Sequence, residues 1–303
     1  MSRTEALVSL VLASIIVGST LLVSRFISAG KSIFFIQLVS MSIAYLILRK
    51  WIGKERLIAE LKLPNKSDYI IYGFQTLSGV VCFRIFLVYG MRYTQAIDAG
   101  IILSLTPIMT VLLSVIFLKE QLGKREIIAM MCAFIGVLII NLNGVHESTS
   151  SSSLTVWGNI MIFMAVIGES AFVIFSKKTT ARISPLTRSM LICSIAVCMF
   201  LPLSIYELIR DYSFLMSVEF WLLSTYYGVV LTVTAYVLWF RAIPYVSGTT
   251  AGIFNSLIPV SAILLVFIVL GETMSLTQVG GLMFIFTGVG LIVFSKEKLQ
   301  PVE

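Results

Sequence analysis

The chain carries one stretch of sequence twice, and this duplication restricts the fold more than any other feature. Residues 93–140 and 245–292 align without a gap at a shift of 152, and 17 of the 48 aligned pairs are identical. Apolar composition alone would match leucines and isoleucines, but not glycine, serine, proline and glutamate together. The chain therefore contains two homologous units. Identical pairs include Gly100/Gly252, Ser104/Ser256, Pro107/Pro259, Glu120/Glu272 and Gly136/Gly288.

The composition places both units in a membrane. Of 303 residues, 58% are hydrophobic and only 12% are charged, whereas soluble domains carry roughly 25% charged residues. A bilayer core needs about 20 apolar residues per helix, and lipid-facing sheet or loop would leave backbone groups unpaired. We therefore predict an all-α integral membrane protein with ten transmembrane helices, five in each unit. The predicted spans are 6–26, 32–50, 69–90, 96–118, 125–142, 156–176, 185–205, 219–240, 248–270 and 277–295.

The distribution of basic residues predicts how the units are oriented. With the amino terminus inside, 17 lysines and arginines fall in inner segments and four in outer ones, which places both termini in the cytoplasm. Because five spans per unit is an odd number, the second unit must be inverted. We expect repeats over 1–145 and 156–303, an outer linker over 146–155, and a multi-pass protein of the cell membrane. These bases lie in short loops and do not indicate a nucleic-acid partner.

Several motifs of the chain carry a resemblance to a known family: AIDAGIILSLTPIMTVLLSVIFLKEQLGKRE with the following Gly136, GTTAGIFNSLIPVSAILLVFIVLGETMSLTQ with Gly288, Tyr236, Leu238 and Trp239, and Gly18-Ser19. With these motifs the chain resembles the EamA-type members of the drug/metabolite transporter superfamily, and the resemblance covers nearly the whole chain. The chain departs from the family's pattern at two positions. Val17 replaces the family's usual tryptophan before Gly18, and Glu169 occupies a position that is usually apolar or aromatic.

The resemblance implies a secondary active transporter without a cofactor that moves an amino acid, a related metabolite or a drug across the membrane. Two inverted units are the usual construction for alternating access, with substrate between them. By resemblance alone we expect an exporter, driven by proton or solute exchange. The alternative is a channel or a structural subunit without coupled transport. An enzyme is not expected, because the single histidine lies in the linker and one carboxylate lies deep in a span.

Two prolines mark the expected moving parts. Pro107 and Pro259 fall near the middle of spans 4 and 9, where proline removes a backbone hydrogen bond and bends a helix. Interrupted helices at matching positions of two repeats point toward a binding site. We therefore predict a hinge or cavity wall, with Ser104, Ser256 and Asn255 close to the bends. The alternative is a static kink used for packing.

Arg84 lies deep in span 3, where a charge costs at least about 2.5–3.5 kcal/mol to insert and should face a wet cavity or an anion. Its counterpart at the shift of 152 is Tyr236, which shares a helical face with Trp239. We predict that Arg84 and Tyr236 face each other across a central cavity. The alternative is that the long side chain of Arg84 snorkels to the outer interface.

Glu169 is the only acid deep inside an apolar run, and its approximate counterpart is Ser19 in the first repeat. A carboxyl there suits substrate binding or proton transfer during transport. Alternatives are a structural ion pair with Arg84 and an interfacial position.

The repeated Glu120 and Glu272 are expected to cap the helices that directly follow them. Rows of glycine and alanine in spans 5 and 10, such as Gly136 and Gly288, indicate close helix packing or the seam of a homodimer.

Overall fold

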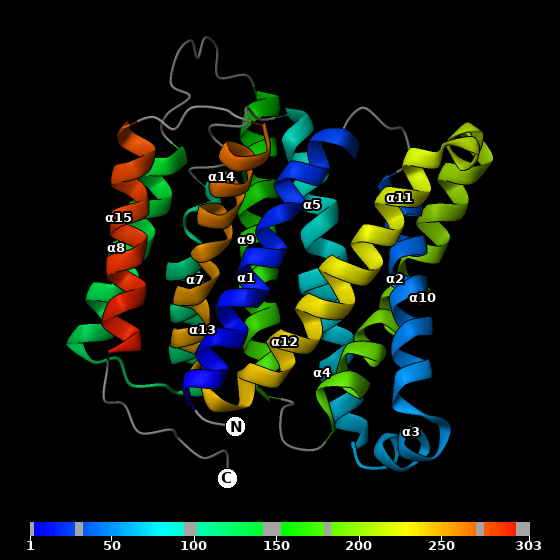
Figure 1. Ribbon diagram of the computed structural model, residues 1–303, viewed down its shortest axis with the longest axis horizontal. Coiled ribbons are helices and arrows are strands. Elements are labelled where there is room, and N and C mark those ends of the chain that lie inside the picture. The colour runs from blue at the N-terminus through cyan, green and yellow to red at the C-terminus, as the bar shows by residue number, and fades with distance from the viewer. Residues whose placement is uncertain are drawn as a thin grey trace.

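The computed structural model describes residues 3–27, 33–93, 102–141, 153–178, 183–270 and 276–294, and every regular element within these ranges is helical (Figure 1). The first repeat contains α1 (Arg3–Ile27), α2 (Ile33–Ile52), α3 (Lys54–Leu61), α4 (Lys66–Thr76), η1 (Leu77–Cys82), α5 (Phe83–Tyr93), α7 (Thr106–Leu113), η2 (Ser114–Leu118) and α8 (Lys124–Asn141). The second contains α9 (Ser153–Lys178), α10 (Pro185–Arg210), η4 (Ser213–Met216), α11 (Val218–Tyr226), η5 (Tyr227–Thr234), α12 (Ala235–Ala242), η6 (Ile243–Tyr245), α13 (Gly248–Asn255), α14 (Leu257–Leu270) and α15 (Leu276–Val293).

Five helical segments within the described ranges are long and apolar enough to cross a bilayer. Three further apolar segments are shorter, namely Thr4–Ser19, Thr106–Leu118 and Val279–Val293. The predicted class, an all-helical membrane protein, is therefore confirmed, while the count of ten spans stays a prediction. The five long segments are Phe34–Ile52, Lys66–Leu87, Leu154–Lys178, Pro185–Arg210 and Val218–Tyr245.

The two repeats run in opposite directions. Helix α2 begins at Ile33 and α10 begins at Pro185, which is 152 residues later, so the two helices are counterparts. They pack side by side and antiparallel, because the last turn of α10 contacts the first turn of α2 through a hydrogen bond from the Phe35 amide to Glu207 Oε2 (3.0 Å). We call the end of the molecule at which α1 begins and α15 ends the lower end, and the opposite one the upper end (Figure 1).

The repeats share one core and do not form separate domains. Helix α15 packs along α8, α10 along α2, α9 along α5, and α1 against α12 and α14, so each of these pairs joins the first repeat to the second. A single cluster of buried apolar side chains includes Leu10 and Met41 from the first repeat and Phe200 and Phe254 from the second. A site between the repeats is consequently enclosed by packed helices from both.

The predicted bounds of the repeats and of the linker stay a prediction. Helix α9 begins at Ser153. Residues 146–152 of the predicted linker 146–155 and Glu272 lie outside the described residues.

The α8–α15 contact generates a prediction about packing. A Cβ added at Gly288 would lie 2.7 Å from the Ala129 carbonyl oxygen, whereas a Cβ at Gly290 would meet no atom within 4 Å. Overpacking typically costs about 1–3 kcal/mol, and here a backbone atom would have to move. We expect Gly288→Ala to lower the melting temperature of the purified protein and Gly290→Ala to leave it equal or raise it. Equal melting temperatures for the two variants would contradict this close contact.

Candidate functional site

A cavity of about 150 Å³ lies between the repeats. Its walls come from α1, η1 and α5 of the first repeat and from α9, η5, α12, α13 and α14 of the second. An apolar cavity of roughly this volume in another protein holds benzene, so the space suits a small metabolite. The lining residues are Ala13, Ser14, Val17, Gly79, Phe83, Arg84, Glu169, Phe172, Val173, Tyr227, Leu231, Ala235, Tyr236, Trp239, Asn255 and Ile258.

Half of the lining residues are related by the internal duplication. The shift of 152, first seen in residues 93–140, also pairs positions in α1 with α9 and in α5 with α12. Both members of each pair line the cavity, so the cavity lies where the inverted repeats meet symmetrically. The pairs are Val17/Glu169, Gly79/Leu231, Phe83/Ala235 and Arg84/Tyr236.

Two broken helices lie beside the cavity at matching positions. The chain turns at Ser104 and Leu105 before α7 begins, and it turns at Ser256 between α13 and α14. Each break is followed within three residues by proline. We predicted mid-helix bends caused by these prolines, but Pro107 and Pro259 lie in the first turns of α7 and α14, where a missing amide hydrogen costs no helical hydrogen bond.

Carbonyl groups at the breaks receive hydrogen bonds from nearby hydroxyls. Thr106 Oγ1 donates to the Leu103 carbonyl (2.8 Å), and Ser256 Oγ donates to the Ile253 carbonyl (2.6 Å). Such groups cannot turn to water inside a bilayer. These hydrogen bonds therefore stabilise both breaks, and Asn255 and Ile258 on either side of the second break line the cavity.

Spans 3 and 8 each change to π-helical geometry just before the residues with which they line the cavity. Segment η1 ends at Cys82 and η5 ends at Thr234, again 152 residues apart. The residues that follow directly are Phe83 and Arg84 in one repeat and Ala235 and Tyr236 in the other. π-helical turns are rare and concentrate at functional sites, which favours a site at this position.

Arg84 points into the cavity and not to the outer interface. Its Nη1 donates to Gln37 Oε1, and its guanidinium lies within interaction range of the Tyr236 and Tyr227 hydroxyls. These partners are neutral. The positive charge is thus held in place by dipoles and remains available to an anion in the cavity.

Glu169 lines the same cavity from α9. Its described hydrogen bond is a long one from Thr106 Oγ1 (3.5 Å). Within the part of the chain that the structure describes, no ion pair joins it to Arg84. The cavity therefore contains a cation from the first repeat and an acid from the second that do not neutralise each other.

The other residues predicted for the site divide into two groups. Tyr236, Trp239 and Asn255 line the cavity together with Arg84 and Glu169. Ser19 does not, and its hydroxyl instead bonds the Tyr226 hydroxyl (2.8 Å). By the shift of 152 the counterpart of Glu169 is Val17, which does line the cavity. Ser104 and Ser256 are buried beside the breaks, outside the lining.

The sequence interpretation missed several aromatic residues of the wall and one buried cation. Phe83 could have been found by extending the shift of 152 from Arg84. Phe172 packs against Gly79, where a Cβ would lie 2.2 Å from the Phe172 Cβ. Arg188 was counted among the inner loop charges, yet it is 2% exposed, donates to the Ser176 carbonyl and lies 4.5 Å from the Phe240 ring. Orientation statistics cannot distinguish such an arginine from a loop base.

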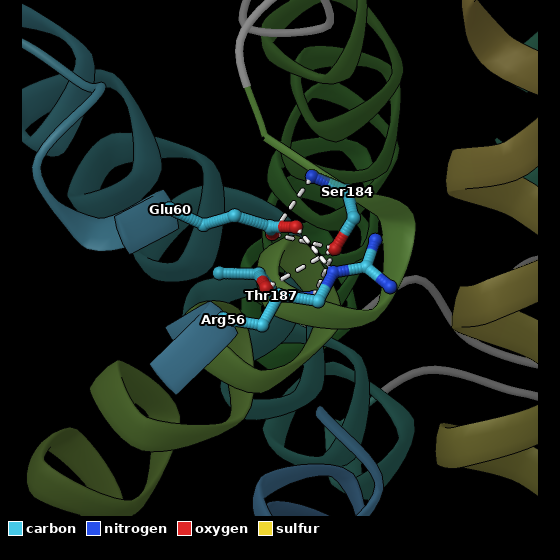
Figure 2. Close-up of polar contacts among 4 residues, drawn as sticks. All are labelled: Arg56, Glu60, Ser184 and Thr187. Carbon is cyan, nitrogen blue, oxygen red and sulfur yellow. Dashed lines mark hydrogen bonds and ion pairs between the residues drawn. The ribbon is translucent and has the colours of Figure 1, made fainter. Parts of the chain in front are cut away.

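Below the cavity, the loop helix α3 of the first repeat contacts the start of α10 in the second (Figure 2). Glu60 Oε2 accepts hydrogen bonds from the Ser184 amide (3.1 Å) and the Ser184 hydroxyl (2.6 Å), and Arg56 Nε donates to Glu60 Oε1 (2.7 Å). Partial burial raises the pKa of Glu60, but the hydrogen bonds from Ser184, Thr187 and Arg56 outweigh it and lower the pKa to about 2.

Two helical repeats thus enclose a mainly apolar cavity that also contains Arg84 and Glu169, an arrangement found among membrane transporters. The EamA-like transporter family matches residues 4–142 and again residues 156–294. The chain is 31% identical over 296 residues to the uncharacterized transporter YetK of Bacillus subtilis (strain 168), covering 97% of this chain and 88% of that protein. It is 27% identical over 218 residues to an uncharacterized transporter of Archaeoglobus fulgidus, covering 71% and 74%.

A solved crystal structure also matches, with a TM-score of 0.79 over 96% of this chain and 97% of that chain at 15% identity. At that identity the likeness concerns the fold alone. Taken with the sequence matches, these findings show that the chain belongs to the EamA-like transporter family, a family of membrane transporters and not of enzymes.

The Glu60 contact generates a prediction about pH. The pKa of Glu60 is lowered from 4.5 to about 2 in the folded protein, so its stabilising contribution is fully present above about pH 4.5 and is lost as the pH falls toward 2. We expect the melting temperature of Glu60→Gln to lie below that of the wild type by a constant margin between about pH 5 and about pH 8. This difference in melting temperature should narrow in more acidic buffer. Glu55→Gln, which alters an exposed acid of the same helix, is the control. A margin that closes near neutral pH would contradict this assignment.

Proposed function

We propose that this protein is a secondary active transporter that moves a small zwitterionic metabolite of the amino-acid kind across the cell membrane by alternating access. One observation carries the proposal. A single cavity between inverted repeats holds Arg84 and Glu169, unpaired with each other. Buried charges need partners, and a ligand that carries both a carboxylate and an ammonium would supply them.

In the proposed complex, Arg84 binds the substrate carboxylate and Glu169 binds the ammonium. Gln37 and Tyr236 orient the guanidinium. Aromatic side chains, including Phe83 and Trp239, contact the apolar part of the substrate, and the cavity volume of about 150 Å³ favours a compact molecule.

The proposal includes the arrangement in the membrane. Ten spans form repeats over 1–145 and 156–303 with an outer linker over 146–155, and both termini lie in the cytoplasm. The repeats rock against each other about the breaks at Ser104 and Ser256, so that the cavity opens to one side at a time. Helix α8 and the glycine-rich α15 form a tight pair, and the outer surface of this pair is the proposed contact of a homodimer.

For energy coupling we propose exchange of substrate against a proton or a second solute at Glu169. Once the ammonium has left, the carboxyl binds a proton, which removes an uncompensated charge from the cavity before the empty protein reorients. Export is the proposed direction, on the strength of the family resemblance.

Counterflow with proteoliposomes tests the substrate class. We expect saturable counterflow of compact amino acids, and loss of counterflow for their methyl esters, which lack the carboxylate, and for their N-acetyl forms, which lack the ammonium. A channel would pass solute without counterflow. Equal handling of an amino acid and both derivatives would exclude the zwitterion.

Matched substitutions test the two charges. Arg84→Gln and Glu169→Gln each remove a charge-assisted hydrogen bond worth about 1.5–3 kcal/mol, so we expect apparent affinity to fall roughly ten- to hundredfold. Arg84→Gln should no longer distinguish the amino acid from its methyl ester, and Glu169→Gln should no longer distinguish it from its N-acetyl form. Arg241→Gln and Glu55→Gln, at exposed positions, are the controls. Wild-type counterflow in folded Glu169→Gln would remove its proposed role.

The breaks give a separate test. Replacing Pro107 and Pro259 together by alanine restores an amide hydrogen at both positions and favours continuous helices through Ser104 and Ser256. We expect slower counterflow while substrate still raises the melting temperature, because binding survives and reorientation does not. Unchanged counterflow would show that the breaks do not act as hinges.

A further inference from the structure

A second carboxylate contact across the repeats at the lower end is made by Glu120, which follows η2 at a sharp turn. Glu120 Oε1 accepts a hydrogen bond from the Gly248 amide (2.6 Å), and Oε2 accepts from the Thr249 amide (3.0 Å) and the Thr249 hydroxyl (2.8 Å). The first amides of a helix have no partner within it. A carboxylate of the first repeat therefore caps α13 of the second.

This contact corrects the expectation that Glu120 caps the helix directly after it. That helix is α8, in the same repeat, and its own Glu126 lies beside Gly123 at its start. Sequence proximity suggested α8 because the folded position of α13 cannot be read from the chain. Glu272, the counterpart of Glu120, lies outside the described residues.

Helix α13 joins the Glu120 contact to the cavity. Its first residues, Gly248 and Thr249, donate hydrogen bonds to Glu120, and its last residue, Asn255, lines the cavity. Figure 1 shows α13 in the lower half of the molecule and α14 in the upper half, on either side of the break. A movement of α13 about Ser256 would thus change access to the cavity from below.

Helix α13 packs directly against α7 and η2 of the first repeat. A Cβ on Gly252 would lie 2.6 Å from Thr110 Cγ2, and one on Gly248 would lie 2.8 Å from Leu118 Cδ1. The Ser114 and Thr249 hydroxyls are also hydrogen-bonded to each other (3.0 Å). These contacts hold α13 close to α7 and η2.

The turn before α13 is held by a charge of the opposite sign. Lys177 Nζ, on α9, donates to the Val246 carbonyl (2.6 Å) and the Ile243 carbonyl (3.4 Å). Carbonyl groups of the turn thus contact a cation, and the amides that follow contact the Glu120 anion. Lys177 belongs to the same repeat as α13, so Glu120 is the charge that joins this turn to the other repeat.

We propose that Glu120 is the latch that keeps the substrate pathway closed at the lower end. When Glu120 releases Gly248 and Thr249, α13 moves away from α7 and the cavity opens downward. Release exposes the carboxylate and both amides to water, which replaces the lost partners. The closed and open states therefore differ little in free energy, as a reversible gate requires. The inference deepens the proposed transport function and rests on it.

Accessibility of a cysteine in the cavity tests the latch. Cys82, Cys132, Cys193 and Cys198 are replaced by serine or alanine, and Val17→Cys places a thiol in the cavity wall. An impermeant maleimide is applied separately to each face of proteoliposomes. A parallel Ser67→Cys variant, at an exposed position in the first turn of α4, identifies the lower face.

We expect Glu120→Gln to raise the rate of labelling from the lower face at least tenfold and not to raise it from the upper face. Glu55→Gln is the matched control and should leave both rates unchanged. A purely structural cap would give a different result, namely faster amide hydrogen exchange at Gly248 and Thr249 without faster labelling of the cavity thiol. That result would overturn the proposal.

A second substitution keeps the test decisive if Glu120→Gln is poorly recovered. Thr249→Val removes one donor to the same carboxylate and should give a smaller increase from the same face, and unchanged labelling in the folded Thr249→Val variant would refute the latch. Labelling requires no substrate. A failure of the counterflow experiments would therefore count against the zwitterionic substrate and leave the latch intact, and the reverse also holds.

Discussion

Backbone groups in a bilayer must find hydrogen-bond partners within the protein, and the cavity depends on how this chain meets that requirement. Breaking two helices beside the cavity frees carbonyls and amides. Some are bonded locally, but others are bonded by the opposite repeat. Ser14 Oγ of α1 donates to the Phe254 carbonyl (3.1 Å), and Ser261 Oγ donates in return to the Ser14 carbonyl (3.1 Å). Close approach of α1 to α14 is possible because residue 18 is glycine, since a Cβ there would overlap the Ser261 side chain. Side chains of each repeat therefore donate hydrogen bonds to backbone carbonyls of the other.

The same reciprocity organises the charged residues. Carboxylates of one repeat hold helix starts of the other at both ends of the molecule: Glu60 and Glu120 at α10 and α13 below, and Glu207 at α2 above. Between these ends, the cavity residues Arg84 and Glu169 do not form an ion pair with each other. The arrangement separates two tasks, since acids at the ends fasten the repeats together while Arg84 and Glu169 in the middle stay open to a ligand. A transporter needs both, because a site that satisfied its own charges would have little affinity left for substrate.

The sequence predicted the helical class, the duplication, and three residues of spans 3 and 8 that line the cavity, namely Arg84, Tyr236 and Trp239. These follow from apolar length, charge bias and one alignment shift, which are properties of the chain itself. It did not predict that Pro107 begins a helix after a break, because periodicity does not reveal where backbone hydrogen bonds stop. It also assigned Glu120 to the wrong helix, because its partner α13 is more than a hundred residues away in the chain. It paired Glu169 with Ser19 because each follows a glycine, whereas the shift of 152 that relates the repeats pairs Glu169 with Val17. The contacts between the two repeats were thus the features that the sequence pattern could not predict.

The pairing of Arg84 with Tyr236 bears on why the two repeats share one polypeptide. An antiparallel homodimer of a single unit would present every side chain twice, so an arginine at this position would bring two like charges into a small, dry space. It would likewise supply either two acids or none at the position of Glu169. Joining the units in one gene lets each copy change alone, and one copy can then contribute the base while the other contributes the acid. The mismatch at these positions is therefore a property that a homodimer of one unit could not have.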